Sequence, residues 1–187
     1  MATVREGNRA VLLVVDVQAD VVAHAWDAQR VIGNIARTVE RARAQGVPVL
    51  WVQHSDDELR HGSAGWQWVS ELVPAAGEAL VHKHFNSAFE QTSLEQALAR
   101  LGATHITLAG AATNWCIRAT AYAALERGYD LTLVQDAHTT RSTDLGNGRK
   151  IEACSMVDDL NAAMTGLSYP GRSNRTTTAE ALDFTFA

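Results

Sequence analysis

The sequence predicts an α/β fold in which helices cover both faces of a mainly parallel sheet. Apolar runs of strand length alternate along the chain with segments whose apolar residues recur at helical spacing. The run AVLLVV at residues 10–15 is continuous and rich in β-branched residues, which is typical of a strand buried on both faces. Strands and helices that alternate in this way connect by right-handed crossovers, so a three-layer αβα sandwich is expected.

The first half of the chain is expected to supply three strands. Asp16 ends the first strand, and the apolar residues of segment 27–46 then recur at helical spacing up to a glycine, a helix-stop residue. The second strand is expected at 47–53 and the third at 79–83. Residues 54–78 between them are polar and irregular, and so long a connection in a compact domain predicts a functional loop.

The second half of the chain continues the alternation. We expect Ser93 and Gln96 to form a capping box at the start of one helix, and Thr113 to cap a later helix. The remaining elements are expected in the following order: a helix at 93–102, a strand at 104–110, a helix at 113–128, a strand at 130–136, a helix at 150–164 and an edge strand in the tail, which ends in LDFTFA. This order predicts a Rossmann-like sheet of about six strands, and the length of 187 residues predicts a single domain over residues 1–187.

The composition excludes several classes of protein. A net charge of -5 supplies no basic excess to neutralise phosphates, so neither nucleic acid nor a membrane surface is an expected partner. No run of 18 apolar residues occurs, so no membrane span is expected. The first residues lack the basic-then-apolar order of a signal peptide, and the chain has only two cysteines. A cytoplasmic location without disulfides is therefore expected.

Three chemically reactive side chains lie where predicted strands end. Asp16 follows the first strand, Lys83 ends the third, and Cys116 stands just beyond the fourth, in the stretch GAATNWCIRATA. Each alone has an ordinary structural explanation, as a turn former, a solvated lysine or an inert core thiol. Because the carboxyl ends of parallel strands meet at one edge of a sheet, we expect the three side chains to lie together at a ligand site.

Together these groups suit acyl transfer. Lys83 and the first turn of a helix capped at Thr113 are expected to favour the thiolate form of Cys116. Asp16 is suited to accept the thiol proton and return it to a leaving amine, while backbone N–H groups of the first turn are suited to hold an oxyanion. Cys154 lies in a helix-period segment without such partners and is expected to be an inert core thiol.

The segments VLLVVDVQAD, VHKHFNSAF and LAGAATNWCIRATAYAALERGYDLTLVQDAHTT, in this order and spacing, resemble the isochorismatase-like cysteine hydrolases. That superfamily includes nicotinamidases, N-carbamoylsarcosine and ureidoacrylate amidohydrolases, and the isochorismatases. The resemblance covers roughly residues 9–165. It implies a catalytic triad with Asp16 as general base, Lys83 as the partner that holds charge, and Cys116 as nucleophile.

The same resemblance implies two features that periodicity does not reveal. One is a cis peptide bond between Ala111 and Ala112, and the other is an oxyanion hole built from the backbone N–H groups of Ala112 and Cys116. The resemblance also implies a small-molecule substrate and a homo-oligomer, either a dimer or a tetramer.

The loop after the second strand departs from the nicotinamidase pattern. Nicotinamidases typically carry an Asp-x-His there, plus a further histidine, to bind a metal. In this chain the stretch VQHSDDELRHG contains His54, Asp56 and His61 without that order, and surface histidines in a loop are the simpler interpretation. His82 and His84 flank Lys83 on the same strand and would point away from a site that Lys83 faces. No metal and no cofactor are therefore assigned.

The presence of Cys116 favours cleavage of a small amide or ureide C–N bond through a thioester. Vinyl-ether hydrolysis of the isochorismatase type is the enzymatic alternative, since Asp16 alone suffices for it. A non-catalytic signalling domain with a phosphorylation switch is a further alternative, although a Mg²⁺ site would require more carboxylates at the end of the first strand. Weaker candidates for substrate-binding residues, each equally typical of structural positions, are Gln18, Trp66, Phe85 and Trp115.

Overall fold

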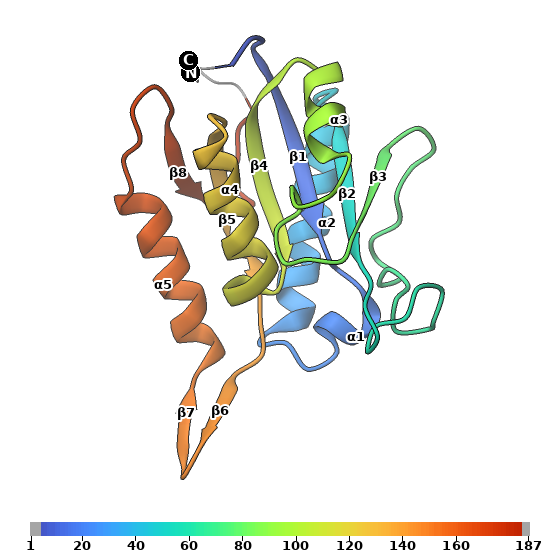
Figure 1. Ribbon diagram of the computed structural model, residues 1–187, viewed down its shortest axis with the longest axis vertical. Helices are drawn as coiled ribbons and strands as arrows, with labels where there is room; N and C mark the ends of the chain where they lie inside the picture. Colours follow the sequence, from blue (N-terminus) through green and yellow to red (C-terminus); the bar gives the residue numbers. More distant parts are fainter. Residues whose placement is uncertain (1–4, 185–187) are drawn as a thin grey trace.

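The computed structural model describes residues 5–184 and contains a six-stranded sheet in which every neighbouring pair is parallel (Figure 1). The strands lie in the order β3–β2–β1–β4–β5–β8. Their bounds are β1 (Arg9–Val15), β2 (Val49–His54), β3 (Ala79–Lys83), β4 (Ala103–Ala111), β5 (Asp130–Thr139) and β8 (Asn174–Thr177). The predicted fold class is therefore confirmed.

Helices cover both faces of this sheet. Leu12 and Val14 of β1 belong to the core cluster that includes the apolar face of α2, whereas Leu13 and Val15 belong to the cluster that includes α3, α4 and α5. The alternation follows from the two-residue period of a strand. The helices are α1 (Ala19–Val22), α2 (Ala28–Ala44), α3 (Leu94–Arg100), a π-helical turn η1 (Thr113–Ile117), α4 (Arg118–Glu126) and α5 (Ala153–Gly166).

Both predicted helix caps are wrong. The Ser93 side chain makes no capping hydrogen bond, and the neighbouring Thr92 hydroxyl accepts one from Leu94 N instead. The Thr113 hydroxyl is hydrogen bonded to a histidine of β5, and the chain enters η1 through the carbonyl of Ala112, which accepts from two later N–H groups. The turn that holds Cys116 is therefore a wide π turn rather than a capped α-helical turn.

The tail supplies an edge strand, as predicted. The sixth strand is β8, whose residues pair with Leu131–Val134 of β5. The strand lies upstream of the final stretch LDFTFA, of which residues 182–184 form no strand and the rest lie outside the described residues. Leu182 and Phe184 are instead buried in the core cluster on the α2 face, so their apolar side chains serve packing rather than strand pairing.

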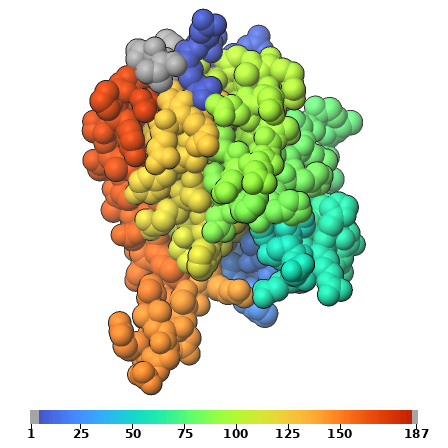
Figure 2. Space-filling model, viewed as in Figure 1, coloured from blue at the N-terminus to red at the C-terminus, as the bar shows by residue number. Residues whose placement is uncertain are grey.

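Two segments outside the six-stranded sheet extend beyond the carboxyl ends of its strands. The long connection from β2 to β3 contains no helix or strand, and Trp68 within it forms an isolated bridge with Gln18. After β5, the antiparallel hairpin of β6 (Thr143–Gly146) and β7 (Arg149–Ile151) projects from the body of the molecule (Figure 2). None of the helices within residues 5–184 is long and apolar enough to cross a membrane.

Candidate active site

Strands β1, β3 and β4 bring the three predicted reactive residues to one edge of the sheet. Lys83 Nζ lies 2.7 Å from Asp16 Oδ2 and 3.2 Å from Cys116 Sγ. All three are buried, with exposed fractions of 1% for Asp16, 1% for Lys83 and 9% for Cys116. Sequence positions far apart thus form one cluster with an ammonium group between a carboxylate and a sulfur.

The backbone around this cluster is unusual at three places. Asp16 adopts a left-handed conformation with φ of 53°, which its backbone N–H, donated to the Val52 carbonyl at 2.9 Å, helps to hold. A Cβ at Gly110, where φ is 132°, would lie 2.0 Å from the Val15 carbonyl oxygen, so only glycine fits there. The peptide bond between Ala111 and Ala112 is cis.

The ionisation of the three groups reflects their burial. Burial raises the pKa of Asp16, although the charge of Lys83 acts against it. Burial opposes the ammonium form of Lys83, but the charge of Asp16 and the contact with Cys116 together outweigh it and raise the Lys83 pKa. Lys83 is therefore a cation at neutral pH, and the carboxyl group of Asp16 binds a proton more tightly than an exposed aspartate does.

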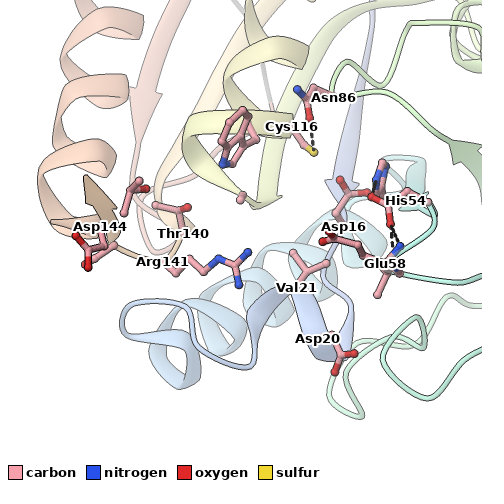
Figure 3. Close-up of a pocket in the computed structure, with 16 residues that line it drawn as sticks. Asp16, Asp20, Val21, His54, Glu58, Asn86, Cys116, Thr140, Arg141 and Asp144 are labelled. Atoms are coloured by element: carbon pink, nitrogen blue, oxygen red, sulfur yellow. Dashed lines mark hydrogen bonds and ion pairs between the residues drawn. The ribbon is translucent and has the colours of Figure 1, made fainter. Parts of the chain in front are cut away.

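The surroundings of Cys116 favour the neutral thiol over the thiolate. Burial and the nearby Asp16 charge raise the pKa of Cys116 to about 12, although Lys83 acts to lower it. The thiol also faces Asn86, whose Oδ1 lies 3.9 Å from the sulfur (Figure 3). Lys83 acts on the Cys116 pKa in the expected direction, but desolvation and the Asp16 charge outweigh it, so the net pKa is raised. The sulfur must lose its proton to a base as it reacts.

A cavity of about 600 Å³ opens beside this cluster. It is large enough for a small organic molecule. Figure 3 shows Asp16, His54 and Cys116 around it, with Arg141 extending into it from the segment after β5. The lining residues are Asp16, Asp20, Val21, His54, Asp56, Glu58, Leu59, Asn86, Ala112, Trp115, Cys116, Thr140, Arg141, Ser142, Thr143 and Asp144.

Of the four weaker substrate-binding candidates, Trp115 lines the cavity and is 56% exposed. Gln18 does not line it: its side chain is fully buried and bonds the backbone of His54 and Trp66, which fixes the loop after β2. Trp66 does not line the cavity and packs on His61, with ring centroids 4.3 Å apart. Phe85 contributes only its carbonyl to the site, as an acceptor 3.0 Å from Lys83 Nζ.

The loop histidines do not form a metal centre. His54 Nε2 lies 2.9 Å from Asp56 Oδ2, but His61 packs against Trp66 and His82 instead. Within residues 5–184, no three side chains of histidine, cysteine, aspartate or glutamate are grouped so that they could hold a metal ion.

Asn86 and residues 140–144 were not identified from the sequence as part of the site. Residues 140–144, called here the rim segment, line the cavity directly after β5. The rim segment follows β5 directly, so the strand-end rule that located the other residues also applies to it. Asn86 carries no comparable signal, since it lies in an irregular turn after β3.

His138 does not line the cavity but forms hydrogen bonds beneath its surface. It is fully buried, and its ring nitrogens lie 2.9 Å from Thr113 Oγ1 and 3.0 Å from Asn161 Oδ1. The hydrogen bond to Thr113 connects β5 to the turn that carries Cys116. This contact explains why the threonine hydroxyl is not used as a helix cap.

Acid is expected to destabilise the protein through its two most deeply buried histidines. Burial lowers the pKa of His138 to about 4 and that of His105 to about 3, from an ordinary value of 6.5. The unfolded chain therefore binds protons first as the pH falls below 6.5, and stability present above that pH is lost toward the folded-state pKa values. By pH 5 the free energy of unfolding should fall by about 2 kcal/mol for each histidine.

Urea unfolding at several values between pH 7.5 and pH 5 measures this loss. His138→Gln should flatten the pH dependence, whatever it does to stability at pH 7.5, whereas the exposed His61→Gln should leave it unchanged. An unaltered pH dependence in His138→Gln would contradict the assignment.

Comparison with known proteins supports the resemblance found in the sequence. A family model of the isochorismatase domain matches residues 10–156. A streptothricin hydrolase from Streptomyces noursei is 35% identical over 137 residues, which cover 69% of this chain but only 54% of that protein. A ureidoacrylate amidohydrolase from Methylobacterium radiotolerans is 29% identical over 179 residues, covering 76% of this chain and 69% of the relative.

Solved structures share the same architecture. A crystal structure of an isochorismatase from Pseudomonas putida superposes with a TM-score of 0.82 at 24% identity, covering 95% of this chain and 93% of that one. At this identity the likeness shows the fold, while the family model, which matches most of the chain, shows descent. The chain therefore belongs to the isochorismatase domain family.

Proposed function

We propose that this chain is a cysteine hydrolase that cleaves a small amide or ureide C–N bond, with Cys116 as nucleophile, Asp16 as general base and acid, and Lys83 as the group that holds charge between them. One observation carries the proposal: the Lys83 ammonium contacts both the carboxylate of Asp16 and the sulfur of Cys116, and these two residues line a cavity large enough for a small molecule. We further propose that residues 1–187 act as one domain.

In the acylation half of the reaction, the substrate carbonyl enters the cavity beside Cys116. Asp16 takes the thiol proton while the sulfur attacks the carbonyl carbon, so that a thiolate never accumulates in a buried site. The backbone N–H groups of Ala112 and Cys116 donate to the oxyanion of the tetrahedral intermediate. Asp16 then returns the proton to the leaving nitrogen, the C–N bond breaks, and ammonia or an amine departs from a thioester.

In the deacylation half, water attacks the thioester and Asp16 accepts its proton. The C–S bond breaks, the acid product leaves, and the proton returns to the sulfur. The raised pKa of Asp16 suits this double use, because a carboxyl group transfers protons best when its pKa lies closer to the working pH. Lys83 remains an ammonium throughout and stabilises the negative charge wherever it resides.

The relatives support the choice of an amide or ureide bond. They include a streptothricin hydrolase and a ureidoacrylate amidohydrolase. This chain spans only about half the length of the former, so its own substrate is to be found by experiment.

A screen of small primary amides and ureides for ammonia release tests the proposal. Intact-mass spectrometry of enzyme quenched during turnover should show a mass increase equal to the acyl group, located on the peptide that contains Cys116. Hydrolysis that releases ammonia without any such adduct, even with slowly deacylating substrates, would argue against the thioester.

A further inference from the structure

Lys83 has more hydrogen-bond acceptors around it than it has protons. An ammonium group carries three N–H donors. Its nitrogen lies 2.7 Å from Asp16 Oδ2, 3.0 Å from the Phe85 carbonyl, 3.2 Å from Cys116 Sγ and 3.3 Å from His54 Nδ1. The two shortest contacts go to oxygen, so the third proton is shared between the sulfur and the histidine.

The histidine must be an acceptor in this contact. Because an ammonium group only donates, His54 Nδ1 must present its lone pair to Lys83, which leaves the ring proton on Nε2. Asp56 Oδ2 lies 2.9 Å from His54 Nε2 and accepts the hydrogen bond that the Nε2–H group donates. The other oxygen, Oδ1, accepts from the backbone N–H groups of Glu58 and Leu59 at 2.9 and 2.6 Å, which fixes the carboxylate.

We propose that His54, held in its Nε2–H tautomer by Asp56, is a positioning residue for Lys83. At rest, with the thiol neutral, His54 Nδ1 shares the third Lys83 proton with the sulfur. When Asp16 takes the thiol proton, the thiolate becomes the stronger acceptor, and Lys83 turns the same N–H toward the sulfur. No covalent bond to Lys83 changes in this step, since only the direction of one hydrogen bond is exchanged. The proposal rests on the function proposed above.

Asp56→Asn tests the tautomer sharply. The two backbone N–H groups will retain the amide oxygen, so the amide NH₂ must face His54 Nε2 as a donor. The ring proton then moves to Nδ1, so that two hydrogen-bond donors, His54 Nδ1–H and the Lys83 ammonium, face each other. We expect kcat to fall by more than about tenfold, with a smaller change in KM, because a wrong tautomer disables an otherwise intact site. Asp57→Asn, an equal change of charge at the next position, is the matched control.

Two variants of His54 distinguish the need for a hydrogen-bond acceptor from the need for the imidazole ring. His54→Asn retains an oxygen acceptor near the former Nδ1 and should keep kcat within about threefold, whereas His54→Leu removes the acceptor and should lower kcat by more than about tenfold. A merely structural role would not produce rescue by asparagine.

Nitrogen NMR of ¹⁵N-histidine-labelled protein reads the tautomer without any substrate. The expected result is a protonated Nε2 and an unprotonated Nδ1 at His54 in the wild-type protein, and the reverse in Asp56→Asn. A protonated Nδ1 in the wild-type protein would overturn the inference, as would equal kcat values for Asp56→Asn and Asp57→Asn. Hydrolysis that survives in Cys116→Ala would instead overturn the proposed function, while the NMR result for His54 would still stand or fall separately.

Discussion

Cys116→Ala is expected to lower kcat/KM for amide hydrolysis by at least about 10⁴-fold, because the substitution removes the attacking atom and leaves binding and the Asp16–Lys83 pair in place. The side chain is small and replaced by one slightly smaller, so thermal unfolding should change little. Steady-state ammonia release on the best substrate from the screen measures the effect. The half-buried Cys154, which does not line the cavity, provides the matched control, and Cys154→Ala should retain wild-type kcat/KM.

The same variant separates amide cleavage from ether cleavage. Vinyl-ether hydrolysis by protonation needs an acid rather than a nucleophile, so it should survive Cys116→Ala and disappear in Asp16→Asn. A chain that keeps its principal activity without the sulfur but loses it without the carboxylate would be an ether hydrolase, and the thioester mechanism would be excluded.

The convergence of Asp16, Lys83 and Cys116 was predictable because it depends on topology alone. Once alternating strands and helices indicate a parallel sheet, the carboxyl end of every strand lies at the same edge, wherever it falls in the sequence. The observed sheet order is β3–β2–β1–β4, so the end of β1 lies beside the end of β4 and one strand away from the end of β3, a gap that the long Lys83 side chain spans to reach Asp16. The sequence pattern therefore predicts which residues meet, and needs no knowledge of side-chain conformation.

The state of the thiol was not predictable in the same way. Sequence reasoning weighed a helix start and a lysine, both of which favour a thiolate, but the extent of burial follows from packing that periodicity does not reveal. The π turn at Thr113–Ile117 and the hydrogen bond from Thr113 to His138 also depend on tertiary contacts. Gln18, Trp66 and Phe85 were misplaced for a related reason, since the path of a loop decides where its side chains point.

Lys83→Met is expected to lower the free energy of unfolding by about 3–5 kcal/mol at pH 7, because it leaves the Asp16 carboxylate buried without its cation. Asp16 is 1% exposed and lies 2.7 Å from Lys83 Nζ, so solvent cannot replace the lost partner. Urea unfolding of the two single variants and of Asp16→Asn/Lys83→Met measures the effect as a double-mutant cycle. The double variant should regain most of the lost stability, since both charges are removed together, yet it should remain inactive.

The pH dependence of Lys83→Met distinguishes a lost ion pair from a packing defect. Burial already raises the pKa of Asp16, and loss of the opposing lysine charge will raise it further. A carboxyl group whose pKa is raised in the folded state binds its proton more tightly when folded, so stability is gained as the pH falls and lost as the pH rises through that pKa. Lys83→Met should therefore recover stability relative to the wild-type protein between pH 7 and pH 5. Two results would contradict this account: a loss in the free energy of unfolding that stays constant between pH 7 and pH 5, or a double variant no more stable than Lys83→Met. Either would mean that the methionine disturbs packing and that Lys83 does not hold Asp16 as a charged group.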